Sequence, residues 1–266
     1  MTTRPPRATR AIETTLTTVG AAALGGGFGA ALGLVGGAPA AIAAGSAGAV
    51  SAGLNGVFGG YRQIYDWHSF KGWFAFVSDS TWGLLGTTLG NALNLANARK
   101  GASYRADFSR RQNRHVFEHG AAMKPRFAFT HGNVISNAAT GRDSLVEERR
   151  PFIDRHEGLH VWQNRIFGPL YQAVYVAWFA GGALVGAATW ALKREKPKLQ
   201  KVVETAAYYD NPFEFWAYKR DDHWDDNSAE PTLKWRRPEW LPKKPGPSTA
   251  SAPEAPSTDP IPKEHQ

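Results

Sequence analysis

The sequence predicts an α+β fold that is mainly helical, and three observations support this prediction. Between Thr14 and Tyr61 the chain has no Asp, Glu, Lys or Arg and is rich in glycine and alanine, which favours closely packed helices. The segment PFIDRHEGLHVWQNRIF, residues 151–167, repeats its apolar residues at helical spacing. Residues 127–137, FAFTHGNVISN, alternate around a His-Gly-Asn turn, which predicts one strand or a short hairpin.

The composition of the 266-residue chain excludes several classes of protein. Cysteine is absent, so neither a disulfide framework nor a Cys-ligated metal site is possible. Lys and Arg number 31 against 23 acidic residues, and the resulting charge of +8 suits an anionic lipid surface as well as nucleic acid. The basic segment 99–126 contains no nucleic-acid-binding motif, so we expect no nucleic-acid partner. A mean hydropathy of −0.38 argues against a transporter with many spans.

Residues 14–61 are predicted to form a helical hairpin in a membrane. The uncharged run exceeds the roughly 20 apolar residues that cross a bilayer. Gly36, Gly37 and Pro39 divide it into two helices of about 22 residues each. Small residues repeated every fourth position let two backbones approach closely in lipid, and this repeat resembles a glycine zipper (Gly25, Gly29, Gly33 and Gly37). We therefore expect contact with membrane lipid, and homo-oligomers through the glycine-rich helices are possible.

The basic N-terminus, residues 1–13, leaves two alternatives open for the hairpin. Its arginines resemble the positive region of a signal peptide, although the apolar part is longer than the 7–15 residues that such a signal has. A soluble helix rich in Ala and Gly is the other alternative. Arginines before the first helix and Arg62 after the second favour a cytoplasmic location for both ends. We expect the protein in the cell membrane, with the rest of the chain on the cytoplasmic side.

Two features of the middle of the chain carry weaker expectations. The stretch from Trp73 to Leu95 is apolar apart from Asp79 and is predicted to form a buried or surface-lying helix rather than a third span. His115 and His119 are four residues apart, so they would share one face of a helix. No glutamate follows the first of these histidines, and the pair therefore has no catalytic signature.

The motif H-E-x-x-H is formed by His156, Glu157 and His160. On a helix, imidazoles four residues apart reach the same cation, and the intervening glutamate can take a proton from a water bound to it. Zinc lowers the pKa of such a water to about 7. Gly158 weakens this helix by about 1 kcal/mol, and Gly168-Pro169 ends it. The alternative is a structural histidine pair.

A catalytic zinc usually has three protein ligands, so one more is required. Glu214 is the best candidate, because Pro212 suits the first turn of a new helix with Asp210 or Asn211 as its cap. Glu214 in that turn is equally consistent with an acid that stabilises the helix dipole. His131 and His223 are weaker candidates for the ligand position.

Four short motifs follow each other: HEGLH, VWQ, FGPLY, and NPFE with Ala217 three residues on. Together they resemble bacterial zincin-like proteins of the gluzincin type, which carry H-E-x-x-H-x-x-Q and a downstream N-P-x-E-x-x-A. The resemblance covers about residues 127–220. It implies a zincin-like domain with His156, His160 and Glu214 as ligands of Zn²⁺ and Glu157 as general base. Gln163 matches the glutamine of the family and would support a ligand or orient the helix.

The apolar stretch 170–192 is also long enough to span a bilayer. If it did, Glu214 would lie on the side opposite His156, and residues 193–213 are too polar to cross back. We therefore predict that 170–192 does not fully span. It would form a re-entrant or interfacial hairpin around Gly181-Gly182, or a buried helix packed against the Gly/Ala hairpin.

The predicted organisation is a membrane hairpin at 14–61, a zincin-like domain at 62–226 and a disordered, Pro-rich tail at 227–266. This organisation predicts a membrane-associated zinc metallopeptidase that hydrolyses a peptide or protein substrate with metal-activated water. The alternatives are a non-catalytic membrane scaffold with a structural or silent metal site, and a pore-forming glycine-zipper protein. Five residues are candidates for holding the oxyanion: Arg155, Tyr208, Tyr209, Tyr218 and His131.

Overall fold

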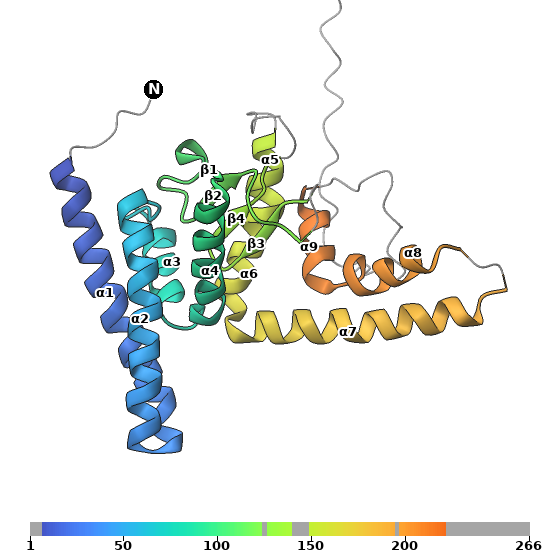
Figure 1. The fold of residues 1–266 in the computed structure, drawn as a ribbon, viewed down its shortest axis with the longest axis horizontal. Helices are drawn as coiled ribbons and strands as arrows, with labels where there is room; N and C mark the ends of the chain where they lie inside the picture. Colours follow the sequence, from blue (N-terminus) through green and yellow to red (C-terminus); the bar gives the residue numbers. More distant parts are fainter. Residues whose placement is uncertain (1–6, 124–126, 140–148, 195–196, 222–266) are drawn as a thin grey trace, which may run out of the picture. The chain divides into compact units, whose positions relative to one another are not determined.

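A computed structural model describes residues 7–123, 127–139, 149–194 and 197–221. The predicted α+β, mainly helical class is confirmed (Figure 1). The helices are α1 (Arg7–Gly33), α2 (Ala38–Arg62), α3 (Phe70–Ser80), α4 (Leu84–Lys100), α5 (Arg150–Phe152), α6 (Gly158–Phe167), α7 (Pro169–Leu192), α8 (Leu199–Glu204) and α9 (Pro212–Asp221). The strands are β1 (Ser103–Tyr104), β2 (His115–Glu118), β3 (Phe129–His131) and β4 (Val134–Ser136). The tail predicted at 227–266 lies outside the described residues.

The glycine-rich segment forms two long antiparallel helices, α1 and α2, as the sequence predicts (Figure 1). A short 3₁₀ turn and Gly37, at φ +84°, connect them. The glycines allow the two backbones to touch: a Cβ on Gly29 would lie 2.3 Å from the carbonyl oxygen of Ala44, and one on Gly48 would lie 2.2 Å from that of Gly25. The glycine repeat therefore forms a contact within one chain, and oligomers through these helices stay a prediction.

Polar contacts fix the open end of the hairpin to the rest of the protein. The Thr17 hydroxyl donates to the Gly56 carbonyl at 2.9 Å. Glu13, on α1, accepts hydrogen bonds from Gln63 and Trp67 and forms an ion pair with Arg111 at 2.6 Å. Helix α1 is therefore held by groups from three later parts of the chain: Gly56 of α2, residues 63–67 and Arg111.

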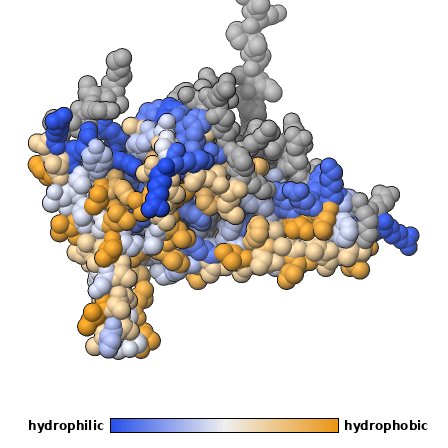
Figure 2. Space-filling model, viewed as in Figure 1, coloured by the Kyte–Doolittle hydropathy of each residue, from blue (hydrophilic) through white to orange (hydrophobic). Residues whose placement is uncertain are grey.

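Three helices in the described ranges are long and apolar enough to cross a membrane, which indicates association with one: residues 7–36, 38–62 and 169–192. Large apolar side chains on α1 and α2 point outward, for example Val19 and Ile42. Figure 2 shows hydrophobic surface over the distal part of this hairpin. Outward-facing apolar residues on a glycine-packed pair of helices are what a lipid environment requires.

The helix predicted across Trp73–Leu95 is two helices, α3 and α4, so this prediction was wrong. The chain turns at Thr81 and Gly83, where the Gly83 amide donates to the Ser78 carbonyl at 2.7 Å. Asp79 is fully buried at the end of α3 and forms an ion pair with Arg165 of α6 at 2.8 Å. The buried charge fixes the end of α3, which periodicity alone does not show.

The four strands form one small sheet in the order β1-β2-β4-β3. The central pair β2 and β4 is parallel, with Val116 opposite Ile135, and the outer pairs are antiparallel. Val116 and Ile135 pack with Ile153 and Val161 of the motif helix, whereas the alternate residues pack toward α4 (Phe117 and Val134 with Leu93). The predicted hairpin at 127–137 is confirmed as β3 and β4.

His115 and His119 do not lie on a helix, so the expectation that they share one helix face was wrong. His115 lies in strand β2, and His119 follows that strand with a φ of +51°. The two imidazoles therefore do not share a helical surface, because a spacing of four residues gives a shared face only within a helix.

Helix α7 is continuous through Gly181 and Gly182, so a hairpin that reverses within it is wrong. It is also not a buried helix, because Tyr171 and Gly186 are its only buried residues. The chain reverses after α7 instead, and α8 packs back along it (Figure 1). A Cβ on Gly182 would lie 2.4 Å from the Ala206 carbonyl, so this glycine permits the close return.

We expect Gly29→Ala to destabilise the hairpin and Gly27→Ala to be neutral or slightly stabilising. The first Cβ collides with the Ala44 backbone, whereas nothing lies within 4 Å of the second. Alanine in an exposed helix is favoured over glycine by up to about 1 kcal/mol. Thermal unfolding in detergent, followed by circular dichroism, measures both, and equal midpoints for the two variants would contradict the close packing.

We expect Asp79→Asn to lower the free energy of unfolding by about 3–5 kcal/mol, because Arg165 would remain buried without its anion. Asp107→Asn is the control, since Asp107 pairs with Arg105 at the surface and such pairs contribute about 1 kcal/mol or less. Denaturant titration in detergent measures the difference. A loss for Asp79→Asn no larger than that of the control would show that the buried pair is dispensable.

Candidate metal centre

The two histidines of the motif lie on one continuous helical segment. It begins at α5, continues through a π-helical turn, Ile153–Glu157, and ends with α6. His156 and His160 are both buried, and their rings lie 5.1 Å apart between centroids. π-Helical turns are rare and occur frequently at functional sites. The predicted helix is therefore confirmed, with a local widening at the first ligand candidate.

Gly158, between the two histidines, has a packing reason to be glycine. A Cβ there would lie 2.9 Å from Nη1 of Arg114. The Arg114 guanidinium donates to the Ile153 carbonyl and forms an ion pair with Asp154. Glycine here lowers the intrinsic stability of the helix by about 1 kcal/mol. It leaves space for the buried Arg114 guanidinium, which holds the π-helical turn.

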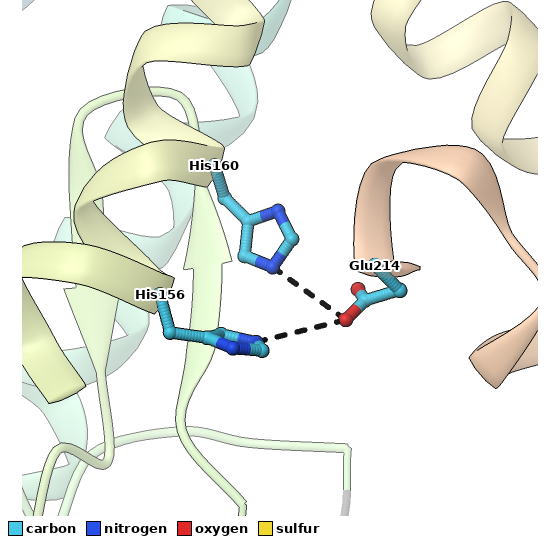
Figure 3. A group of neighbouring side chains, drawn as sticks. All are labelled: His156, His160 and Glu214. Carbon is cyan, nitrogen blue, oxygen red and sulfur yellow. Dashed lines mark ion pairs between the residues drawn. The ribbon is translucent and has the colours of Figure 1, made fainter. Parts of the chain in front are cut away.

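Glu214 enters the site from α9, which begins at Pro212 as the sequence predicts. Asn211 is the cap, because its side-chain oxygen accepts from the Phe213 amide at 3.0 Å. Glu214 Oε2 lies 3.7 Å from Nε2 of His156 and 3.6 Å from Nε2 of His160 (Figure 3). The structure therefore brings together the three ligand candidates that the sequence indicated.

The three ligand atoms lie within 4.8 Å of one another, and all three residues are buried. Two ligand atoms on one tetrahedral zinc lie about 3.4 Å apart, so the group can hold a metal ion with small adjustment. Glu214 Oε2 is buried and accepts no hydrogen bond from the described residues. A buried carboxylate oxygen without a donor is costly, and a cation between the three side chains would remove that cost.

Gln163 sets the orientation of His160. Its side-chain oxygen lies 2.8 Å from Nδ1 of His160, and its nitrogen donates to the Phe213 carbonyl at 3.1 Å. The amide therefore acts as an acceptor toward the ring, so Nδ1 carries the proton and Nε2 keeps its lone pair for a metal. This is the supporting contact that the position of Gln163 predicted.

The charges in the site stabilise one another. Burial acts to raise the pKa of Glu214, but His160 and His156 outweigh it and hold the pKa below its ordinary value. Burial acts to lower the pKa of His160, and the Glu214 carboxylate reverses this and raises it. Protons compete with a metal for these imidazoles, so metal affinity falls as the pH falls.

Glu157 is buried next to the first histidine and has its own hydrogen-bond donor. The Thr130 hydroxyl of β3 donates to Oε2 of Glu157 at 2.5 Å. The edge strand of the sheet therefore holds this carboxylate, which leaves Oε1 for a second contact. Thr130 was not identified from the sequence, since a threonine in a predicted hairpin gives no signal of its own.

Tyrosines surround the group of three. The Tyr175 hydroxyl donates to Glu214 Oε1 at 2.7 Å, and the Tyr218 ring packs edge-on against His156 at 4.5 Å. Tyr171 lies between Tyr175 and Phe213. Sequence analysis missed Tyr171 and Tyr175, although their spacing of four at the start of an apolar helix places them on one face.

The remaining candidates fall into two sets. Tyr208, Tyr209 and Tyr218 form one aromatic cluster beside His156. Burial raises the pKa of Tyr208 and of Tyr218, so both hydroxyls stay protonated at neutral pH and can donate. Arg155 is exposed, and His131 packs against Phe129 outside the group that can hold a metal. His223 lies outside the described residues.

Comparison of the chain with protein-family models, with curated proteins and with solved structures finds no match. The function must therefore be argued from the geometry of this site.

We expect Gln163→Leu to weaken divalent metal binding about 10- to 100-fold, because loss of a residue that orients a ligand typically has this effect. Gln112→Leu is the control, since Gln112 is exposed and distant in sequence from all three ligand candidates. Competition of Co²⁺ between the protein and a chromogenic chelator measures the affinity. Equal affinities for the two variants would show that His160 does not depend on this hydrogen bond.

Proposed function

We propose that this protein is a membrane-associated zinc metallopeptidase. The observation that carries the proposal is the buried group of His156, His160 and Glu214, with Glu157 adjacent in the helix. Two histidines and one glutamate are a ligand set typical of catalytic zinc, because three protein ligands leave a position open for water or substrate. The resemblance of H-E-x-x-H-x-x-Q and N-P-x-E-x-x-A to zincin-like proteins supports the same function.

Each side chain has a role in this proposal. Nε2 of His156, Nε2 of His160 and Oε2 of Glu214 would hold the ion. A zinc ion in this position supplies a water of lowered pKa and polarises the peptide carbonyl. With the ion bound, the Glu157 carboxylate would accept the proton of the attacking water and pass it to the leaving amine nitrogen. The Tyr218 ring contacts His156 directly, and the Tyr208 ring packs on Tyr218, so their hydroxyls are the candidates we propose for stabilising the oxyanion.

The membrane part of the proposal rests on α1 and α2. Both are long enough to cross a bilayer and pack on each other through glycine. Arg10 and Arg62 flank the open end of this hairpin, and positive flanking residues favour the cytoplasmic side. We place the metal site on the cytoplasmic side of the cell membrane.

Zinc content tests the ligand set. Wild-type protein purified in detergent should contain about one zinc per chain by elemental analysis, and Glu214→Ala should contain much less, because two histidines alone bind weakly. Asp107→Ala is the control and should retain its zinc. A wild-type protein that contains no zinc after metal-replete preparation would contradict the proposal.

Activity tests the role of Glu157. We expect Glu157→Gln to keep its zinc and to lose at least about 100-fold in peptide hydrolysis, since general base catalysis contributes roughly 10²- to 10⁴-fold. Cleavage of a mixed peptide library, followed by mass spectrometry, provides the measurement without a known substrate. Zinc in both proteins and cleavage by neither would indicate the alternative function, a scaffold with a structural metal.

A further inference from the structure

Helix α7 has one side that packs on the protein and one side that does not. The packed side carries Tyr171, Tyr175, Trp178, Gly182 and Gly186. Trp178 donates to the Ala206 carbonyl, and the two glycines face residues 202–207 so closely that a Cβ would collide with their backbone. These contacts recur every three to four residues, as expected for one face of a helix.

The other side of α7 is apolar along its whole length. The helix has no charged residue, and its 24 residues extend about 36 Å. The outward side chains include Val176, Leu184 and Leu192, which are 66%, 74% and 86% exposed. Figure 2 shows a mainly hydrophobic band along this helix, with hydrophilic surface beyond its carboxyl end. Soluble proteins rarely expose so large an apolar surface.

The returning chain argues against a membrane-spanning α7. Residue 203 lies beside Gly186, residue 206 lies beside Gly182, and Glu214 contacts Tyr175. The return is therefore antiparallel along α7. If α7 spanned, Glu204, Asp210 and Glu214 would be drawn into hydrocarbon, and an aspartate alone costs about 2.5–3.5 kcal/mol at the centre of a bilayer.

Basic residues identify the kind of surface that covers the apolar side. Lys193 and Arg194 follow α7 directly, and Lys198 and Lys201 begin the return, all of them exposed. An apolar helix face beside exposed basic residues is typical of helices that lie in the interface of an anionic membrane. Two other helices of the chain can cross a bilayer, so a membrane is already beside the protein.

We propose that α7 lies parallel to the membrane plane in the lipid interface, with its apolar side among the acyl chains and Lys193, Arg194, Lys198 and Lys201 at anionic headgroups. Such helices are buried about 5–10 Å into the headgroup and acyl boundary. The Tyr175 hydroxyl is on the opposite side of the same helix and contacts Glu214. The metal centre is then separated from the lipid by the thickness of one helix.

The absence of cysteine allows a direct test on the full-length chain. Single cysteines at Ala173, Ala180 and Ala187, which are exposed and seven residues apart on the outward side, report its depth, and one at Gln200, which is exposed on α8, is the control. Each variant is spin-labelled and reconstituted in vesicles of phosphatidylcholine and phosphatidylglycerol. Power saturation with oxygen and with a water-soluble nickel complex measures the depth of each label.

We expect the three outward labels to be oxygen-rich and protected from nickel at one common shallow depth, and the Gln200 label to be open to nickel. A label at residue 180 much deeper than those at 173 and 187 would mean that α7 spans. Nickel access at all four positions would mean a solvent-facing helix, and spin–spin broadening at the outward labels would mean contact between two copies. Each of these three results overturns the proposal. The depth needs neither metal nor activity, so it is independent of the proposed peptidase function.

Discussion

The buried ion pair between Asp79 and Arg165 is the constraint on which the rest of the structure depends. Both side chains are fully buried, and the guanidinium donates twice to the carboxylate at 2.8 Å. Removing two charges from water costs several kcal/mol per ion and is repaid only when further hydrogen bonds satisfy them. Here Tyr65 and Asn133 donate to the same carboxylate, and Asn133 also donates to Asn55 of the hairpin. The pair therefore joins α2, α3, the turn between β3 and β4, and α6 at one point.

This point matters for the metal centre because Arg165 and His160 lie on the same short helix. A rigid helix transmits position, so fixing one end at Asp79 limits how His160 can move. Gln163, between them, then connects the helix to α9 through the Phe213 carbonyl. A metal site needs ligands held within a fraction of an ångström by supporting contacts. The polar core and the ligand group are consequently parts of one network that extends from the hairpin to Glu214.

Local patterns predicted most of the elements and all three residues that come together in the site. The uncharged glycine-rich run, the alternation at 127–137 and the cap at Asn211 each act over a few residues, so the sequence displays them directly. The turn between α3 and α4 was missed because Asp79 resembles an isolated polar residue until Arg165, far along the chain, is beside it. Strand β2 was missed for a similar reason, since its pairing with β4 determines that His115 is in a strand rather than a helix.

The path of the chain between α7 and Glu214 shows why spacing alone could not complete the site. The sequence requires Glu214 to share a side with His156, but it does not say how residues 193–211 return. Gly182 and Gly186 mark the path of this return, because they are the positions at which another backbone approaches α7. In α1 and α2 the same residue type brings neighbouring helices together, so a glycine repeat predicts close contact without naming the partner. The partner is identified only when both contacting segments are known. In the hairpin, the glycines of one helix face alanines of the other. In α7, they face residues 202–207, which lead to Glu214.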